Sequence, residues 1–301
     1  MRVAVLVAML GLAGCGRLAF DPLSGSHDGG ADGGDSGITP CTSFGPWSSP
    51  TALTALNTPT GEFGPSPSPD GLELYFQSDR VGSSGSDIYV ASRVSRMAPF
   101  GNITPVTVLN TSGNDQNPAF TPDGLTMFFT SDRSAGIFRI YRTTRSAVGA
   151  AWAAPTLVSE LSSFSLLGPM LTKQSTELFA TVGPIASAHL ETATFDGTTF
   201  SPPAVIPEFG TTPPRGWSGI SPDGLMLAYE GQRSVYEIMY VTRSAIGATW
   251  SAEAPFVETN DGNANEDVEW SYDGTELYWA SNRLDVAGNT FDMFVMTRSC
   301  L

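Results

Sequence analysis

The chain of 301 residues is poor in positive charge and in histidine, and each shortage excludes a class of function. Lysine occurs once and arginine fourteen times against thirty acidic residues, so the formal net charge is −15. A nucleic-acid-binding surface needs clustered positive charge to displace counterions, which this composition does not supply. His27 lies in a glycine- and aspartate-rich segment and His189 in the most divergent of the repeats described below. Neither setting predicts a catalytic base, which disfavours a serine-hydrolase triad.

The apolar run from Val3 to Ala13 is too short to span a bilayer as a helix, so behind Arg2 it predicts a secretory signal. The next residues, LAGC at 12–15, resemble the lipobox of bacterial lipoproteins at all four positions. That resemblance implies cleavage before Cys15 and several acyl chains on it, which together anchor a protein stably. Gly16 after the cysteine implies sorting to the outer membrane. An ordinary cleaved signal with an incidental cysteine is the alternative.

Residues 24–37, SGSHDGGADGGDSG, contain no large apolar side chain. Such a segment cannot bury enough surface to offset its ordering entropy, so it predicts a flexible tether. The remaining chain holds most of the 41% hydrophobic residues, with many glycines and prolines that favour turns and short strands. The predicted organisation is a signal peptide over 1–14, a lipidated cysteine and tether over 15–43, and one folded domain over 44–301.

Within the folded domain one motif recurs. It reads SPDGLELYFQSDR at 68–80, TPDGLTMFFTSDR at 121–133, SPDGLMLAYEGQR at 221–233 and SYDGTELYWASNR at 271–283, with an eroded copy, TKQSTELFATVGP, at 172–184. The first residues of successive copies are 53, 51, 49 and 50 positions apart. A fixed period near fifty indicates a repeat architecture.

Each unit combines a Pro-Asp-Gly turn with apolar runs of strand character. The turn favours fixed φ at proline and positive φ at glycine, and a buried strand follows it, as in LELYF. Second and third strands come after it, as in DIYVASR at 87–93 and WAAPTLVSEL at 152–161, and a short run before each turn supplies the fourth. Four strands repeated five times without helical periodicity predict an all-β fold, a five-bladed β-propeller of four-stranded antiparallel blades.

The pattern S-P-D-G-x-x-L-x-F-x-S-D-R followed by D-I-Y resembles the Pro-Asp β-propeller repeat of TolB-like proteins, which are related to WD-repeat proteins. The resemblance covers residues 44–301 and is strong in four units, whereas the third lacks both the turn and the arginine. TolB-type propellers usually have six blades, while the repeats counted here predict five. The resemblance implies a role in binding at the cell envelope.

The two ends of the folded domain predict how the ring closes. FGPWSSPTALTALN at 44–57 matches the last strand of a unit, and DMFVMTRSCL at 292–301 matches the strand before it. The N-terminal strand should therefore complete the C-terminal blade. Aligning this blade with the fourth unit places Cys41 and Cys300 on adjacent positions, 244 and 245. A Cys41–Cys300 disulfide is predicted, because an exported protein permits the bond and the positions are within reach. Two unrelated free thiols are the alternative.

Eight arginines recur with the repeat, four after one strand and four after the next. They are Arg80, Arg133, Arg233 and Arg283, and then Arg93, Arg145, Arg243 and Arg298. A ring of anion-binding sites is one interpretation. The favoured one is structural pairing with the turn aspartates Asp70, Asp123, Asp223 and Asp273, because residues that recur in every blade support every blade.

Charged residues that do not recur are the candidates for ligand binding. They stand at the start of the inner strands, where the chain enters the central channel: Glu62, Asp115, Arg215, Glu266 and Asp267. Acidic residues from three units and one arginine could bind a cationic or sugar-like ligand or a metal. Solvated loop charge is the plain alternative.

The segment DGNANED at 261–267 suggests calcium. It places oxygen-bearing side chains at every second residue, on Asp261, Asn263, Asn265 and Asp267. Calcium loops use this spacing because the ion takes several oxygens from one short turn. The pattern departs from an EF-hand, since Glu266 stands where glycine is expected and the twelfth-position glutamate is missing. No other metal or cofactor is predicted.

These observations favour a lipid-anchored cell-envelope lipoprotein whose propeller binds or scaffolds a protein, peptide or glycan without catalysis. The alternative is a carbohydrate-active enzyme, since five-bladed glycosidases use carboxylates from different inner strands, a role that Glu62, Asp115 and Asp267 could fill.

Overall fold

The computed structural model describes residues 41–83, 85–183, 187–210, 213–232, 235–285 and 290–301. The predicted signal peptide, Cys15 and the tether as far as residue 40 lie outside the described residues. Within the part of the chain that is described, no helix is both long and apolar enough to cross a membrane.

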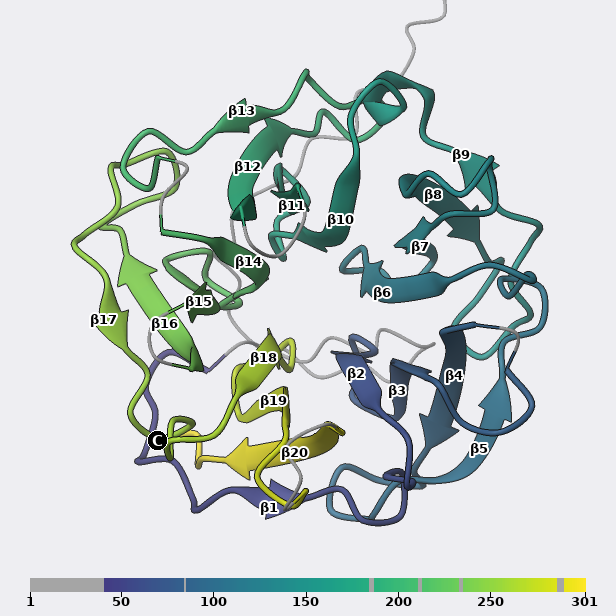
Figure 1. Ribbon diagram of the computed structural model, residues 1–301. Helices are drawn as coiled ribbons and strands as arrows, with labels where there is room; N and C mark the ends of the chain where they lie inside the picture. The colour runs from purple at the N-terminus through teal and green to yellow at the C-terminus, as the bar shows by residue number, and fades with distance from the viewer. Residues whose placement is uncertain (1–40, 84, 184–186, 211–212, 233–234, 286–289) are drawn as a thin grey trace, which may run out of the picture. The chain divides into compact units, whose positions relative to one another are not determined.

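Five four-stranded antiparallel sheets are arranged around a common centre, which confirms the predicted five-bladed propeller (Figure 1). Blade 1 holds β2 (Glu62–Pro67), β3 (Glu73–Ser78), β4 (Asp87–Ser92) and β5 (Gly101–Pro105). Blade 2 holds β6 (Asp115–Phe120), β7 (Thr126–Ser131), β8 (Arg139–Thr144) and β9 (Thr156–Leu157). After the short helix η1 (Ser159–Leu161), blade 3 holds β10 (Leu166–Leu171), β11 (Glu177–Val182), β12 (His189–Thr194) and β13 (Ala204–Val205).

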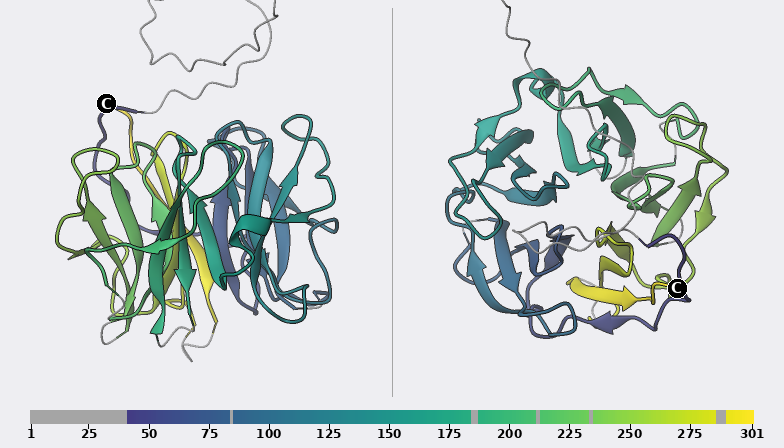
Figure 2. Two further views of the ribbon diagram at one scale, coloured as in Figure 1. Left: turned by 90° about the horizontal axis from the view of Figure 1, so that it is seen from above. Right: turned by 180° about the vertical axis from the view of Figure 1, so that it is seen from behind.

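Blade 4 holds β14 (Arg215–Ile220), β15 (Met226–Gln232), β16 (Tyr236–Thr242) and β17 (Ala254–Pro255). Blade 5 holds β18 (Asn265–Trp270), β19 (Glu276–Ser281) and β20 (Asp292–Thr297), with β1 (Thr51–Ala52) as its outermost strand. In blades 1 to 4 the innermost strand comes first and the chain moves outward before it enters the next blade, and β18, β19 and β20 of blade 5 follow the same order. The strands stand side by side around the ring when it is turned by 90° (Figure 2).

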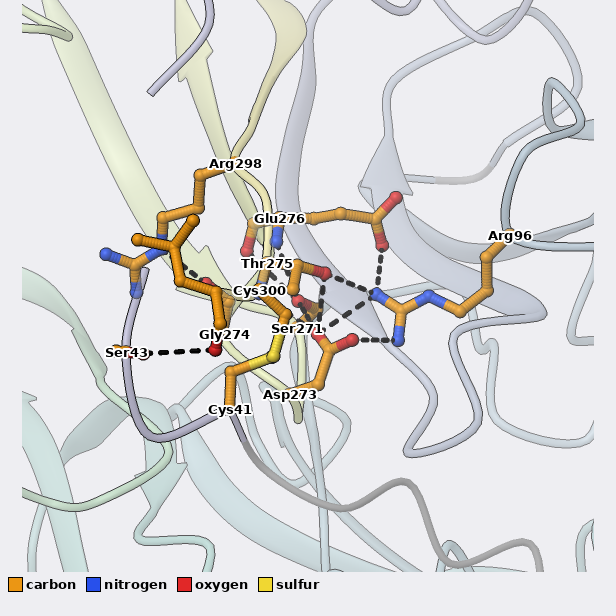
Figure 3. The surroundings of a disulfide bond; sticks show 11 residues. Cys41, Ser43, Arg96, Ser271, Asp273, Gly274, Thr275, Glu276, Arg298 and Cys300 are labelled. Atoms are coloured by element: carbon orange, nitrogen blue, oxygen red, sulfur yellow. Dashed lines mark hydrogen bonds and ion pairs between the residues drawn. A yellow bond between two sulfur atoms is a disulfide. The ribbon is translucent and has the colours of Figure 1, made fainter. Parts of the chain in front are cut away.

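Ring closure follows the prediction. β1 pairs with β20 in antiparallel register, Thr51 opposite Val295 and Ala52 opposite Phe294. The disulfide Cys41–Cys300 joins the same two segments, with Cα atoms 5.6 Å apart (Figure 3). The last blade is therefore built from both ends of the folded domain, and the predicted bridge is confirmed.

The Ser-Pro-Asp-Gly turn is held by its own side chains. In blade 1, Ser68 Oγ donates to Asp70 Oδ1 at 2.6 Å and accepts the backbone N–H of Glu73 at 2.9 Å, while Gly71 has a positive φ of 69°. In the eroded third copy Thr172 Oγ1 accepts the N–H of Glu177, and Ser175 takes the positive φ, 51°, without being glycine. The turn thus survives the loss of Pro-Asp-Gly, although a side chain in this region of φ is strained.

The core consists of apolar layers between neighbouring blades. The second strand of each blade contributes residues that are buried on both faces, among them Phe76, Phe129, Tyr229 and Trp279, each less than 2% exposed. Phe128 of blade 2, for example, packs in one cluster with Leu166 of blade 3. Because each blade buries its faces against its neighbours, the blades depend on one another for stability.

The predicted pairing of the repeat arginines with the turn aspartates is wrong for most of them. Asp70 and its equivalents accept hydrogen bonds inside their own turns, from the Ser or Thr hydroxyl and from the backbone N–H two residues on. Asp273 does form an ion pair, but with Arg96, which is not one of the repeat arginines. Each of these aspartates caps the backbone of its own turn, so the repeat arginines pair with other residues.

The arginines after the second strand are structural, as expected. Arg80, Arg133 and Arg283 each lie over two aromatic rings of their blade and donate to a serine at the end of the second strand. Arg233 lies outside the described residues. The arginines after the third strand link neighbouring blades and are treated below.

Candidate functional site

In four of the five blades the first residue of the inner strand is polar, buried and engaged by the loop or strand next to it, whereas blade 3 has Leu166 there. Glu62 is 0% exposed and accepts hydrogen bonds from the N–H and the hydroxyl of Thr58, at 2.7 and 2.6 Å, and from Ser78 Oγ at 2.9 Å. Asp115, also 0% exposed, accepts from Thr111 N–H at 2.6 Å and pairs with Arg133 at 2.6 Å. Both carboxylates hold the loop that leads into their strand.

Arg215 occupies the equivalent position in blade 4, where it donates hydrogen bonds to the loop instead of accepting them. Its guanidinium donates to the carbonyl oxygens of Phe209 and Pro213, both at 3.0 Å, and pairs with Glu253 at 3.1 Å. In blade 5, Asn265 Oδ1 accepts from Trp279 Nε1 at 3.2 Å and from Arg283 at 2.9 Å. One loop-bracing position therefore carries four different polar or charged side chains around the ring.

The residues that face the ring centre lie two positions further along. The pairing of each inner strand with its neighbour shifts register there, and the third residue has a positive φ in all five blades: Gly64, Asn117, Gly168, Trp217 and Asp267. A bulge of this kind leaves a backbone N–H without a partner in the strand ladder. The ring centre must supply five hydrogen-bond acceptors for these groups.

The preceding blade supplies most of them from the fifth residue of its second strand. Gln77 Oε1 accepts the N–H of Asn117 at 3.1 Å, Thr130 Oγ1 accepts that of Gly168 at 3.1 Å, and Thr181 Oγ1 accepts that of Trp217 at 2.8 Å. Blade 5 has Ala280 at this position, which offers no side-chain acceptor. Asp267 Oδ2 accepts the N–H of Gly64 instead, at 3.0 Å.

These contacts narrow the ring centre. The cavity at the ring centre, between residues such as Pro65, Asn117, Trp217 and Asp267, has a volume of about 20 Å³. That is room for about one water molecule and not for a sugar ring. Asp267 Oδ1 also accepts a hydrogen bond from Asn117 Nδ2 of blade 2 at 3.4 Å, across the centre.

Three carboxylates meet on one side of the centre. Glu230, on β15 of blade 4, is 2% exposed, and its Oε2 has no hydrogen-bond partner among the described residues. Burial and then the charge of Asp267 raise the pKa of Glu230 to about 8. Burial raises the pKa of Asp267 to about 7, although the N–H of Gly64 opposes this, and burial with both neighbours raises the pKa of Glu266 well above its usual range. Burial thus favours the protonated forms of these three carboxyl groups.

The structure thus brings Glu266 and Asp267 together with a third acid, whereas Glu62, Asp115 and Arg215 are each engaged in their own loops. Glu230 was not among the residues predicted from the sequence. A signal for it exists: the fifth residue of the second strand is Gln, Thr, Thr, Glu and Ala in successive repeats, so one copy carries a charge at an inward position.

Three of the four calcium candidates direct their side chains to different partners. Asp261 pairs with Arg283 at 3.3 Å, Asn265 Oδ1 accepts from Trp279, and Asp267 points at the N–H of Gly64. No group of three or more His, Cys, Asp or Glu side chains that could hold a metal is found among the described residues. A calcium ion that bound these residues would have to replace the contacts of their side chains. Calcium binding therefore stays a prediction that rests only on the spacing of the four residues in the sequence.

The other end of β18 carries a second buried charge. Lys173, the single lysine of the chain, stands where most repeats have the turn proline and donates from Nζ to Glu269 Oε1 at 2.8 Å. Its ammonium lies 4.0 Å from the centre of the Tyr272 ring, and Tyr272 donates to the carbonyl oxygen of Phe120 at 2.9 Å. Burial raises the pKa of Glu269, and Lys173 opposes the shift. Together these groups tie blade 5 to blades 2 and 3.

The large hollows of the propeller lie at junctions between blades. One of about 820 Å³, between blades 5 and 1, is mostly apolar and includes Leu53, Met97, Phe100 and Arg298. The other, of about 430 Å³ between blades 4 and 5, includes Trp47, Met226, Tyr240 and Arg298. Hollows of these volumes can hold a small ligand or a few side chains of a partner.

No family model and no curated protein sequence matches the chain. Solved structures resemble it in fold. The α-L-arabinofuranosidase PaAbf62A from Podospora anserina, in complex with cellotriose, superposes with a TM-score of 0.57 and 10% identity over 83% of this chain and 95% of that one. A protein assigned as TolB from Agrobacterium tumefaciens gives a TM-score of 0.52 and 15% identity over 79% and 78%.

TolB from Acinetobacter baumannii gives a TM-score of 0.52 and 15% identity over 81% of this chain, which spans only 56% of the length of that protein. At these identities the similarity establishes the propeller fold alone. The structures that resemble this chain include TolB proteins and an arabinofuranosidase, so the likeness does not indicate one function.

Proposed function

We propose that this protein is a cell-envelope lipoprotein, lipid-anchored through Cys15 in the outer membrane, whose propeller binds a protein, peptide or glycan without catalysis. The observation that supports it best is the narrow ring centre. Side chains of Gln77, Thr130, Thr181 and Asp267 accept the bulge N–H groups around a cavity of about 20 Å³, while the hollows of about 430 and 820 Å³ lie outside at blade junctions. The molecule thus offers surfaces for a partner rather than a central pocket for a substrate.

The hollow between blades 5 and 1 is the larger surface. It is mostly apolar and is bordered by Met97, which is 95% exposed. An exposed apolar side chain beside an apolar hollow is a feature of interaction sites. The structural likeness to TolB proteins agrees with a binding role but does not identify the partner.

Capture of a partner from an envelope extract tests the proposal. The full chain is immobilised, and the bound protein or glycan is identified. Met97→Asp is expected to weaken capture at least about tenfold, because a charge in the hollow must be desolvated. Val81→Asp is the matched control, since Val81 is 100% exposed and lies outside both hollows. Specific capture by neither the parent nor the control would contradict a binding function.

A carbohydrate-active enzyme is the second candidate, supported by the likeness to arabinofuranosidases. Two of the three predicted carboxylates, Glu62 and Asp115, are fully buried and already hydrogen-bonded, which opposes this function. Assay of the full chain on a panel of chromogenic glycosides decides the matter. Turnover that Asp267→Asn and Glu230→Gln abolish, while the fold is kept, would replace the binding module by an enzyme.

Lipid anchoring is tested separately in a bacterial host. Metabolic labelling with an acyl precursor is expected to mark the full chain, and Cys15→Ser is expected to remove the label and release the protein from the membrane fraction. Cys41→Ser should keep the label, because its sulfur belongs to the disulfide. A label that survives Cys15→Ser would overturn the lipoprotein assignment.

A further inference from the structure

A repeated ion pair joins neighbouring blades. The arginine that follows the third strand donates to a glutamate at the start of the second strand of the preceding blade. The pairs are Arg93–Glu276 at 2.8 Å, Arg145–Glu73 at 2.9 Å and Arg243–Glu177 at 3.0 Å. Each arginine also donates Nε to the carbonyl oxygen of its own turn glycine and stacks on an aromatic ring of its own blade.

Two of the five junctions depart from this arrangement, in different ways. Between blades 2 and 3 both partners have changed: Thr126 replaces the glutamate and Phe195 the arginine, and Phe195 stacks on Phe200 with ring centres 4.4 Å apart. Between blades 4 and 5 only the glutamate is replaced, by Met226, and Arg298 remains. The first junction has lost both charges, whereas the second keeps a cation without its anion.

Arg298 is held in place as its equivalents are. Nε donates to the carbonyl oxygen of Gly274 at 2.7 Å (Figure 3). The guanidinium lies 4.2 Å from the Trp47 ring centre. Phe44 covers it as well, at 3.5 Å. No carboxylate of the described residues lies within ion-pair distance of it. Burial lowers the pKa of Arg298, while Asp223 and Asp273 oppose the shift. A stacked guanidinium of this kind is preorganised to bind a carboxylate with two parallel hydrogen bonds.

Both large hollows reach this side chain. Arg298 and Met226 line the hollow of about 430 Å³ between blades 4 and 5, and Arg298 also lines the hollow of about 820 Å³ between blades 5 and 1. A ligand at Arg298 can therefore place apolar groups on both sides of the cation.

We infer that Arg298 is the anchor of a peptide-binding site, in which a glutamate side chain of a partner, beside Met226, supplies the carboxylate that this junction lacks and apolar neighbours of that glutamate enter the flanking hollows. The inference rests on the proposed binding function and names the class of its partner. The other junctions favour a peptide over a sugar acid, because there the carboxylate that meets the arginine belongs to a glutamate followed by leucine, and in Leu72-Glu73-Leu74 it is also preceded by one.

The acidic residues nearby are compatible with this ligand. Asp223 holds the turn position in blade 4 that Asp70 holds in blade 1. In blade 1 the turn aspartate does not prevent a carboxylate from pairing with the arginine, because Glu73 pairs with Arg145. Asp223 is also engaged by its own turn, where Ser221 Oγ and the N–H of Leu225 donate to it. Glu258, which also lines the hollow between blades 4 and 5, disfavours a run of acidic residues. The expected ligand has one acid between apolar residues.

The test uses the full chain and an acetylated, amidated tetrapeptide, Gly-Leu-Glu-Leu, with binding followed by calorimetry and by the Nε–Hε resonance of Arg298. Binding is expected to saturate at millimolar concentration, and the Gly-Leu-Gln-Leu peptide is expected to bind roughly tenfold more weakly. Met226→Glu should weaken the Glu peptide by the same factor, because it supplies the carboxylate within the chain. Met226→Gln is its matched control and should bind as the parent does.

Equal affinity for the two peptides, or equal affinity of the Met226→Glu and Met226→Gln variants, would overturn the inference. Tighter binding of glucuronate than of the Glu peptide would replace the peptide by a sugar acid and overturn it as well. The outcome is separable from that of the proposed function. If the envelope partner is captured equally by the parent and by Met226→Glu, the peptide site is refuted while the binding module stands.

Discussion

Lys173 Nζ lies 2.8 Å from Glu269 Oε1, and this contact joins blades 3 and 5, which are not neighbours in the ring. Both side chains are buried, 9% and 4% exposed, and the Tyr272 ring covers the ammonium. The third repeat has thus lost the turn proline and gained a link across the centre.

Lys173→Met is expected to destabilise the fold by about 3–5 kcal/mol, because it leaves the carboxylate of Glu269 buried without its cation. Urea unfolding followed by circular dichroism measures the change. The double variant Lys173→Met, Glu269→Gln removes both charges and should recover at least half of the loss. A single variant as stable as the parent would show that the pair contributes nothing.

The free energy of unfolding should fall as pH rises from about 5 to 8. Glu230 and Asp267 have folded pKa values of about 8 and about 7, above their ordinary values of 4.5 and 3.8. The folded state therefore binds protons that the unfolded chain has released, so stability is fully present below the unfolded pKa values and is lost as pH rises through the folded ones.

The expected slope is on the order of 1 kcal/mol per pH unit for each of these two buried carboxylates. Unfolding in denaturant at a series of pH values measures it. Glu230→Gln should flatten the slope and Glu237→Gln should not, because Glu237 lies at the start of the neighbouring strand β16, outside the acidic group. A stability that rises over this range would contradict the raised pKa values.

Asp267→Asn and Asp267→Ala should differ in their effects. Asn keeps an acceptor for the N–H of Gly64 and tolerates the positive φ of 54°, so little loss is expected. Ala removes the acceptor and is strained at that φ, which should cost about 1–3 kcal/mol. Adding Ala280→Ser to Asp267→Ala restores an acceptor where other blades have one and should return part of the loss. Equal stability of the Asn and Ala variants would contradict this role.

Removal of the disulfide should destabilise the closed ring. Cys41→Ser with Cys300→Ser is expected to lower the free energy of unfolding by about 2–5 kcal/mol, because the bond spans 259 positions and restricts the unfolded chain. Urea unfolding of the parent with and without reductant should reproduce the difference, and reductant should leave the double variant unchanged. If reductant does not change the free energy of unfolding of the parent, the disulfide does not stabilise the ring.

The sequence predicted the propeller, the shared blade and the disulfide, because all three depend on the repeat period and on alignment of one unit with another. Turn residues and apolar alternation report backbone geometry directly. The partners of the repeat arginines were predicted wrongly, since these side chains reach into the neighbouring blade and no single unit contains the pair. Arg93 with Glu276 is an example.

The acidic group was predicted in part. Glu266 and Asp267 stand out as charges at an inner strand, whereas Glu230 lies in an ordinary apolar run and becomes notable only when the ring brings blades 4 and 5 together. Glu62 and Asp115 stood out for the same reason as Asp267, but burial and local hydrogen bonds use them within their loops. Burial of a charge is a property of the assembled ring, which spacing along the chain does not reveal.

The pairing of β1 with β20 has a consequence for biosynthesis. A chain synthesised from its N-terminus makes β1 early, yet β20, the strand that β1 must pair with, is made after all the other strands. The fifth sheet therefore cannot be completed until β20 has left the ribosome, so closure of the ring has to follow synthesis of the other four blades.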